Sequence, residues 1–311
     1  MTLNIAIING VSTTAAADKR RTAFTPQGNF SENVDKLFPA GEKSLVMFSG
    51  RSYEVDPHAY SQIGELIKDI GGRTFTTLTE QVKALFIALN DLLKQSFKAF
   101  QEKTQASFAQ EVAKNQGKDL RNFRLEEAGN KMQFAADFTS SKGNTRKISF
   151  QFTPLNFLSI GYDNSEIDNP NCFEFKMPGN QVYWLGNFNK ERDIYRILIR
   201  GDKASLPYKL LTGETRQNPN DDFLTKALKY LADSGFFSSK DRNLLQKPFS
   251  VDELSNVPPE EAAILLEYII QATSAALEMF PDPDKGTGTI GKEVDVAAVS
   301  TSKNFRWIKK H

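Results

Sequence analysis

The sequence predicts a layered α+β fold in which helices cover largely antiparallel sheets. Short strand-like runs open the chain, helical patterns follow, more short strands occupy the middle, and a helix and a strand come last. Asn9-Gly10 separates the first two strand-like runs and predicts a hairpin. Helices outside such antiparallel pairs bury their apolar faces on a sheet, which gives a layered domain.

The first sheet is expected to begin almost at residue 2, with no leader in front of it. Residues 3–18 form two short apolar runs around Asn9-Gly10, and Asp18 ends the second run. A further strand is predicted at 44–49 and is closed by Gly50. The N-terminal segment lacks the charged start and the long apolar run of a signal peptide.

Two helices are predicted next. Apolar residues recur at helical spacing from Ile63 to Ile70, and Gly71-Gly72 ends this pattern. A longer pattern begins near Thr79 and runs on to Val112. A helix of about 34 residues would span roughly 50 Å, so its far end is expected to project beyond the sheet or to break.

The remaining elements are predicted from similar patterns. The runs 131–138 and 146–152 flank the turn-forming SSKGN and predict a second hairpin. A loop is expected at 201–220. The other predicted strands are 157–162, 172–177, 182–186, 194–199 and 293–300, and the other predicted helices are 222–232 and 259–279. No convincing linker interrupts residues 1–311, which therefore predict a single domain.

Composition excludes several classes of function. The 39 basic and 38 acidic residues leave no surplus that would favour a nucleic acid or an anionic membrane as partner. Two histidines and one cysteine exclude a Cys/His metal cluster and an intrachain disulfide, and they favour a reducing, cytoplasmic setting. Cys172 is expected to be buried strand packing, because no neighbouring histidine suggests a thiolate. The sequence contains no uninterrupted apolar run of about 18 residues, so no membrane span is predicted.

Thr2 is the first candidate for chemistry. Removal of Met1 would leave Thr2 with a free α-amine, and that amine can act as the base that activates the threonine hydroxyl. A nearby lysine favours the neutral amine by like-charge repulsion, and a carboxylate holds the lysine in place. Lys36 and Asp18 are the candidates for these two partners.

These residues form a recognisable pattern. Thr2 is followed after fifteen residues by Asp18 and then by Arg20, next comes Lys36-Leu37-Phe38, and a strand ends in Ser49-Gly50. This pattern resembles the proteasome β-subunit-type N-terminal-nucleophile (Ntn) hydrolases, and the chain looks like a divergent, bacterial-like member with insertions. The stretch from Asp18 to Lys36 looks two residues longer than in the family.

The resemblance implies a four-layer αββα sandwich of antiparallel sheets flanked by helices. It covers roughly residues 2–90, 157–187 and 250–305. Segments near 100–145 and 190–245 exceed the usual length and are expected to be elaborations. An N-terminal helix ahead of the first strand would mark a non-catalytic α subunit, and the sequence shows none, so the β type is preferred.

The resemblance also implies roles for individual residues. Thr2 would be the nucleophile and, through its amine, the base, Asp18 and Lys36 would tune it, and the backbone N–H of Gly50 would form the oxyanion hole. Thr22 would help to hold a peptide substrate by strand addition.

A supporting network is implied less directly. Arg20 belongs to the N-terminal pattern. The family's Asp-x-x-Ser-Gly loop is matched by Asp284 and Thr287, with threonine replacing serine, although Thr289-Ile290-Gly291 could serve instead. A second serine of the family falls on Asn187, which keeps the polarity without the hydroxyl.

The implied function is a cytoplasmic threonine protease that needs no cofactor or metal. Its subunits would form a homo-oligomer, a ring or stacked rings, with peptides or proteins as substrates and a possible ATP-driven unfoldase left open. Two alternatives remain: a catalytically inactive, proteasome-like structural or binding protein, and an Ntn amidase that acts on small acyl amides.

Overall fold

The structure is a computed structural model. It describes residues 3–25, 28–50, 57–128, 131–163, 169–189, 192–201, 204–214, 222–236, 249–280, 290–300 and 302–311. At 21–25, 28–33, 57–61, 201 and 222 the description covers the backbone alone.

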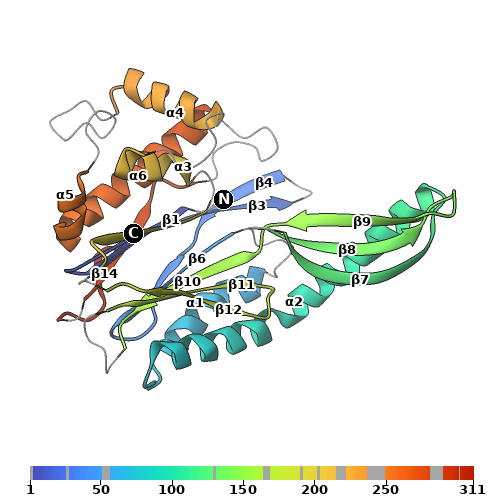
Figure 1. Cartoon of the computed structure of the whole chain (residues 1–311), viewed down its shortest axis with the longest axis horizontal. Helices are drawn as coiled ribbons and strands as arrows, with labels where there is room; N and C mark the ends of the chain where they lie inside the picture. The colour runs from blue at the N-terminus through green and yellow to red at the C-terminus, as the bar shows by residue number, and fades with distance from the viewer. Residues whose placement is uncertain are drawn as a thin grey trace.

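Two five-stranded antiparallel sheets form the body of the molecule (Figure 1). The first sheet has the order β13 (Tyr195–Gly201), β1 (Leu3–Asn9), β2 (Thr13–Asp18), β14 (Val294–Val299) and β15 (Arg306–Lys309). The second sheet has the order β12 (Val182–Asn187), β11 (Asn171–Met177), β10 (Leu155–Gly161), β6 (Ser44–Ser49) and β5 (Leu37–Pro39). The predicted hairpin at Asn9-Gly10 is confirmed by the pairing of β1 with β2.

The two sheets pack face to face through one apolar cluster. Alternate residues of β1 and β2, including Ala6, Ile8 and Ala15, meet Met47 and Leu158 of the second sheet. Successive side chains of a strand point to opposite faces, so the other residues of β1 and β2 are left for the outer face. The alanines of β2 leave room for the second sheet to approach closely.

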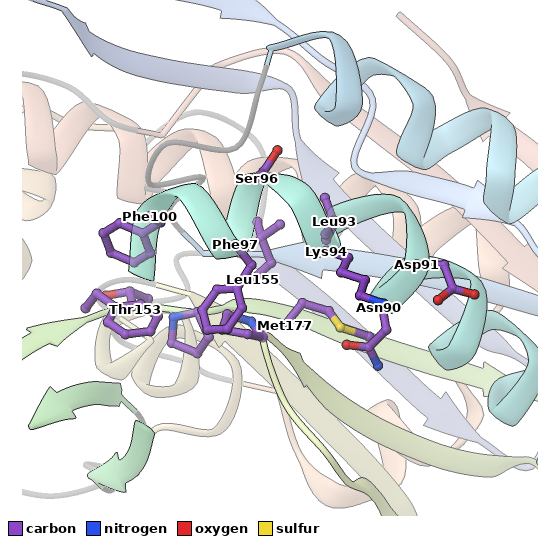
Figure 2. Close-up of a pocket in the computed structure, with 13 residues that line it drawn as sticks. Asn90, Asp91, Leu93, Lys94, Ser96, Phe97, Phe100, Thr153, Leu155 and Met177 are labelled. Carbon is purple, nitrogen blue, oxygen red and sulfur yellow. The ribbon is translucent and has the colours of Figure 1, made fainter. Parts of the chain in front are cut away.

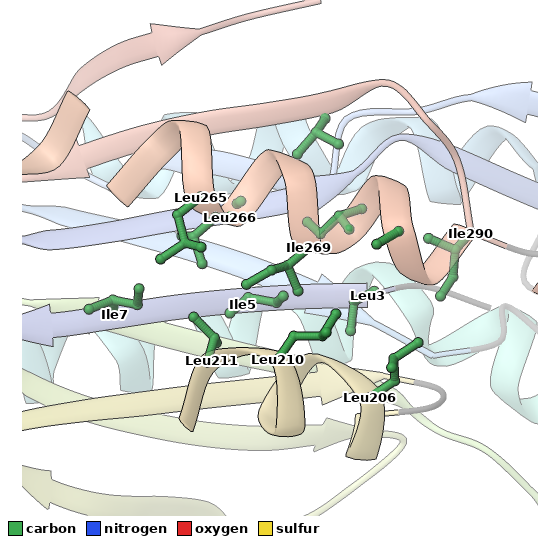
Figure 3. Packing of buried hydrophobic residues seen from close by; sticks show 14 of the residues in the cluster. Leu3, Ile5, Ile7, Leu206, Leu210, Leu211, Leu265, Leu266, Ile269 and Ile290 are labelled. Carbon is green, nitrogen blue, oxygen red and sulfur yellow. The ribbon is translucent and has the colours of Figure 1, made fainter. Parts of the chain in front are cut away.

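Helices α3 (Ser205–Thr212), α5 (Val251–Asn256) and α6 (Pro259–Met279) cover the outer face of the first sheet, and α4 (Asp222–Asp233) packs on α3 and α6. Figure 3 shows Leu3, Ile5 and Ile7 of β1 between α3 and α6, surrounded by their leucines and Ile269. By length and composition α6 could span a membrane, but most of its apolar residues are buried inside the protein. It is therefore a core helix.

Helices α1 (Pro57–Gly71) and α2 (Leu78–Lys114) cover the outer face of the second sheet. Val82, Leu85 and Leu89 of α2 pack with Phe157 and Phe175 of the sheet. A capping box starts α2: the Thr77 side chain accepts from the Glu80 backbone, and the Glu80 side chain accepts from the Thr77 backbone. The described part of the chain is therefore an α+β sandwich, as predicted.

The far half of α2 leaves the body. The helix is unbroken over 37 residues, about 55 Å, so the predicted projection is confirmed. An antiparallel sheet of β7 (Lys118–Ala128), β8 (Lys131–Thr139) and β9 (Thr145–Phe152) lies on it and forms, with residues 97–114, an arm (Figure 1). The arm has its own cluster around Phe100, Phe108 and Phe134. The single-domain assignment and the two elaborations stay predictions.

The loop prediction for 201–220 is wrong at α3. Leu206, Leu210 and Leu211 of this helix are buried against the first sheet, and Pro207 lies in the first turn, where the missing N–H is tolerated. Gly213 ends the helix with a left-handed φ of 73°. The helix therefore forms because it buries one face of leucines, although the surrounding composition is typical of a loop.

Several further elements were not predicted. They are short or exposed, so their patterns are weak: β3 (Arg20–Thr25), β4 (Gly28–Asn33), β7, α5 and β15. In β7 the residues Asp119 and Asn122 have positive φ, and the register with β8 shifts twice. These irregularities interrupt the two-residue alternation on which strand prediction depends. The strand expected at 293–300 is also not the last, because β15 follows it.

Candidate active site

Asp18 is the centre of the candidate site. It ends β2 and is completely buried. Oδ1 accepts the backbone N–H of Leu3 at 2.6 Å. Oδ2 accepts the backbone N–H groups of Arg20 at 3.2 Å and Gly291 at 3.1 Å, and the Lys36 ammonium at 3.0 Å. Four donors from four separate places in the chain therefore fix one carboxylate.

Lys36 reaches Asp18 from the second sheet. It directly precedes β5, and its backbone oxygen accepts the Phe48 N–H at 3.0 Å, which ties it to β6. Its side chain is 1% exposed, and Nζ donates to Asp18 and to the backbone oxygen of Arg20. The Asp18–Lys36 pair thus joins the two sheets at the start of β1.

The Lys36 ammonium is removed from water, and this burial affects its pKa. Burial lowers the pKa of Lys36 below its usual value, and the Asp18 carboxylate partly opposes that shift. A lysine in this setting can lose or share its proton more readily than a lysine in water. The pair can therefore influence the protonation of a group placed beside it.

Gly50 follows β6 in a conformation that requires glycine. Its φ is +112°, and a Cβ atom built on it would lie 2.0 Å from the Pro154 carbonyl oxygen. The backbone at this position is therefore held both by its own conformation and by the segment that leads into β10. A backbone N–H fixed in this way is suited to stabilise a developing oxyanion.

The structure places the other expected residues as follows. Arg20 contributes its backbone N–H and carbonyl to the pair, while its Nε is buried without a hydrogen-bond partner among the described residues. Thr22 lies on β3, where its backbone pairs with Ser31. Thr2, Asp284 and Thr287 lie outside the described residues.

Asn187 is not brought to the site, which corrects the expectation for it. It pairs with Asn171 at the start of β11, and β12 is the edge of the second sheet opposite to β5. Ser49 and Gly50 lie at the other end of these strands, beside Asn156. Gly186 has a φ of +102° at the strand irregularity, so the Gly-Asn pair serves strand geometry there.

Gly291 was named only as an alternative, yet it contacts the site directly. Besides donating to Asp18, it packs so closely on Arg20 that an added Cβ would lie 2.8 Å from the Arg20 Cβ. The preceding residue, Ile290, is buried, and its backbone oxygen accepts the Ser274 hydroxyl at 2.8 Å. Helix α6 thus holds the segment that presents Gly291 to the carboxylate.

A second polar cluster lies on the inter-sheet face and was missed by sequence reasoning. Arg200 binds Glu174 through two hydrogen bonds of 2.6 and 2.9 Å, and Asn156 donates to the same carboxylate at 2.8 Å. Asn4 lies opposite Arg200 in the β1–β13 register and is 1% exposed, with both side-chain polar atoms lacking a partner among the described residues. Polar residues such as Asn4 and Glu174, which alternate with apolar residues within predicted strands, could have indicated this cluster in the sequence.

A pocket of about 350 Å³ lies between α2 and the segment joining β9 to β10 (Figure 2). Leu93, Phe97 and Leu155 line its apolar part, and Asp91 and Lys94 lie at its α2 side. Pro154, another lining residue, is the one that contacts Gly50. The described residues contain no group of His, Cys, Asp and Glu side chains that could hold a metal ion.

Cys172 is packing, as predicted, and its thiol is expected to resist alkylation in the native protein. The residue is completely buried in β11, and burial raises its pKa to about 11. At pH 8 the reactive thiolate is therefore both rare and inaccessible. Intact mass after iodoacetamide treatment should show no adduct in buffer and one adduct in guanidinium. Rapid labelling in buffer would contradict this burial.

Comparisons with known proteins add little to this description. No family model matches the chain, and no curated protein matches it. Among solved structures, the chain is similar to a mutant of Anbu from Hyphomicrobium sp. strain MC1, with 12% identity, a TM-score of 0.45, and coverage of 99% of this chain and 87% of that chain. A likeness of this degree carries no argument about function.

Proposed function

We propose that this protein is a threonine-type Ntn hydrolase of the proteasome β-subunit type that cleaves peptide bonds through Thr2 after Met1 is removed. One observation carries the proposal. The Leu3 N–H, which belongs to the peptide bond between residues 2 and 3, donates to Asp18, and Asp18 binds Lys36. The buried pair is therefore one peptide unit away from the proposed nucleophile.

The chemistry follows from the donors of Lys36. An ammonium has three N–H groups, and the described residues account for two of them, one to Asp18 and one to Arg20. We assign the third to the Thr2 side. The positive charge there favours the neutral α-amine, which titrates near 7.7–8.0 when unperturbed. The amine takes the hydroxyl proton, and the hydroxyl attacks the substrate carbonyl.

Gly50 supplies the next step. Its N–H stabilises the oxyanion of the tetrahedral intermediate, and the leaving amine takes the proton from the α-amine. Water then attacks the acyl-enzyme and regenerates Thr2.

The cost of burying the pair supports a functional role. Two charges in a protein core are rarely more stabilising than apolar residues of similar volume. Asp18 and Lys36 are 0% and 1% exposed, so both are almost fully desolvated. Perturbed, buried ionisable pairs concentrate at functional sites, which favours retention of this pair for chemistry.

The finer fold and the biological setting belong to the same proposal. The described helices and sheets are consistent with the four-layer αββα arrangement of the Ntn hydrolases. Assembly of identical subunits into a ring or stacked rings, and a cytoplasmic location, are expected for a peptidase of this kind. An Ntn amidase for small acyl amides would use the same pair.

One observation favours the inactive alternative. Asn187, the expected counterpart of a supporting serine, lies at the far end of the second sheet. A proteasome-like binding protein could keep Asp18 and Lys36 as a structural pair while lacking the full network. The hydrolase and the inactive binding protein differ in whether Thr2 reacts with an electrophile.

Labelling with an epoxyketone tests the proposal, because this electrophile requires the hydroxyl and the amine of an N-terminal threonine together. We expect the wild-type protein to lose Met1 and to gain one adduct at Thr2, as seen by peptide mass spectrometry. Thr2→Ala should gain none. Thr145→Ala, a change of an exposed threonine on the arm, should label like the wild type.

Two results would contradict the hydrolase. If the intact mass always includes Met1, the α-amine of Thr2 is blocked and cannot act as base. If wild type and Thr2→Ala turn over substrate equally, Thr2 is not the nucleophile. A panel of fluorogenic peptides and small acyl amides then separates the peptidase from the amidase.

A further inference from the structure

Four charged side chains form a network directly beside the Asp18–Lys36 pair. Lys310 Nζ lies 2.7 Å from a carboxylate oxygen of Asp35 and 2.7 Å from one of Asp295. Lys19 Nζ lies 3.2 Å from Asp35 and 3.9 Å from Asp295. The network therefore joins two basic and two acidic side chains.

The network flanks both members of the pair in sequence. Lys19 follows Asp18, and Asp35 precedes Lys36. The backbone joins the same two segments, because the Val34 N–H donates to the Lys19 carbonyl at 2.7 Å. The segments that carry Asp18 and Lys36 are therefore held together by this backbone hydrogen bond and by the Lys19–Asp35 ion pair.

Lys310 enters this network from a distant part of the chain. Strand β15 pairs with β14, which carries Asp295, and the residues after β15 continue toward Asp35. The His311 backbone N–H donates to Asp295 at 2.9 Å, and the His311 backbone oxygen accepts Lys19. The Lys310 ammonium also lies 4.6 Å from the centre of the Trp307 ring. Several independent contacts thus fix its position.

Burial divides this network: the Lys310 and Asp35 side chains are 34% and 36% exposed, whereas Asp295 is buried. Exposed pairs contribute little because water screens them. Asp295 is 1% exposed and the Lys19 side chain is 10% exposed, so the contacts to Asp295 are the ones that water screens least. The Asp35 pKa agrees with this: burial opposes ionisation, yet hydrogen bonds from Lys310 and Lys19 hold the pKa below its usual value.

We propose that Lys310 is a positioning residue for the Asp18–Lys36 pair. By bridging Asp35 and Asp295 it fixes the segment before Lys36 against the end of the first sheet. Its catalytic consequence rests on the proposed hydrolase function, whereas its effect on the pair does not. The residues after β15 therefore control the alignment of a site that they do not touch.

The neighbouring lysine supplies a matched control. Lys309 lies on β15 and, within the described part of the chain, pairs at 2.5 Å with Glu267 on α6. Lys310→Met and Lys309→Met therefore remove the same charge one residue apart, and only the first loses the bridge to Asp35. Lys310→Arg keeps the charge and is the conservative rescue.

Amide hydrogen exchange tests the positioning without any activity. We expect Lys310→Met to speed exchange at Val34 and Phe48, whose N–H groups bind the Lys19 and Lys36 carbonyls, by about 10-fold relative to wild type. Lys309→Met and Lys310→Arg should exchange there like the wild type. Unchanged exchange in Lys310→Met, or an equal increase in Lys309→Met, would overturn the proposal even if the enzyme is active.

Kinetics test the consequence. Lys310→Met should lower kcat on a fluorogenic peptide on the order of 10-fold with KM close to wild type, because small misplacement affects the reacting geometry. Its Tm should also fall, because the buried Asp295 carboxylate loses its nearest ammonium. Lys309→Met should leave kcat unchanged. Absence of Thr2 labelling in the wild type would refute the proposed function alone, since the exchange result stands independently. A loss of kcat matched by Lys309→Met would refute the positioning role.

Discussion

Replacement of Lys36 by Met is expected to reduce the proposed peptide hydrolysis by about 10²- to 10⁴-fold, the range of general acid–base catalysis, because the α-amine that acts as base loses the charge that tunes it. It should also destabilise the fold by about 3–5 kcal/mol, because Asp18 is left as a buried charge without its counter-ion. The three backbone N–H donors to Asp18 remain, so the carboxylate stays in place but unneutralised. Turnover of a fluorogenic peptide and urea unfolding measure the two effects.

A double-mutant cycle with Asp18→Asn supplies the control. Asparagine presents one N–H₂ group, and both carboxylate oxygens of Asp18 face N–H donors, so either orientation sets donor against donor. Each single change leaves one buried charge, whereas the double change leaves none. The double variant should therefore lose less stability than the sum of the single variants. Simple additivity would contradict the direct pairing of Asp18 with Lys36.

Replacement of Gly50 by Ala is expected to have the second large effect. The new methyl group would overlap the Pro154 carbonyl oxygen at 2.0 Å, and the φ of +112° is unfavourable for alanine. Strain and overpacking together should destabilise the protein by roughly 2–6 kcal/mol. Displacement of the Gly50 N–H should also lower turnover by about 10²-fold or more. Thermal unfolding and peptide hydrolysis provide the measurements.

Two other glycines separate the causes of this effect. Gly143 has a φ of +81° with open space around its missing Cβ, so alanine there adds strain alone, about 1–2 kcal/mol. Gly10 has open space, and its φ lies outside that left-handed range, so alanine there should change stability by less than about 0.5 kcal/mol. A Gly50→Ala variant no less stable than Gly143→Ala would show that Pro154 does not confine Gly50.

The donors around Asp18 explain why this site is expected to be rigid. Three of the four are backbone N–H groups, contributed by β1, β3 and the segment after Ile290. Backbone donors are held by the sheets and by α6 and cannot change rotamer. The carboxylate therefore positions Lys36 without relying on flexible side chains, which suits a preorganised site.

Much of the architecture could be predicted from the sequence because the relevant signals are local. The Asn-Gly turn, the strand closed by Gly50 and the helix that begins at Pro259 each depend on a few adjacent residues. The spacing that resembles the Ntn hydrolases also pointed to Asp18 and Lys36, and the structure brings these two side chains together. Weak or irregular patterns, such as β7, could not be read in this way.

The partners of the pair could be decided only by the tertiary structure. Gly291 is 273 residues from Asp18 in the chain, and Lys310 lies 275 residues from Asp35, so no local pattern links either of them to the site. Asn187 was misplaced for the converse reason: a Gly-Asn pair suggested a supporting residue, but the register of β12 carries it to the far end of the second sheet. Sequence alone determined the elements and the spacing of the central residues, since these depend on neighbouring side chains. Which distant groups surround that centre depends on how the sheets and α6 pack, and the folded chain alone specifies it.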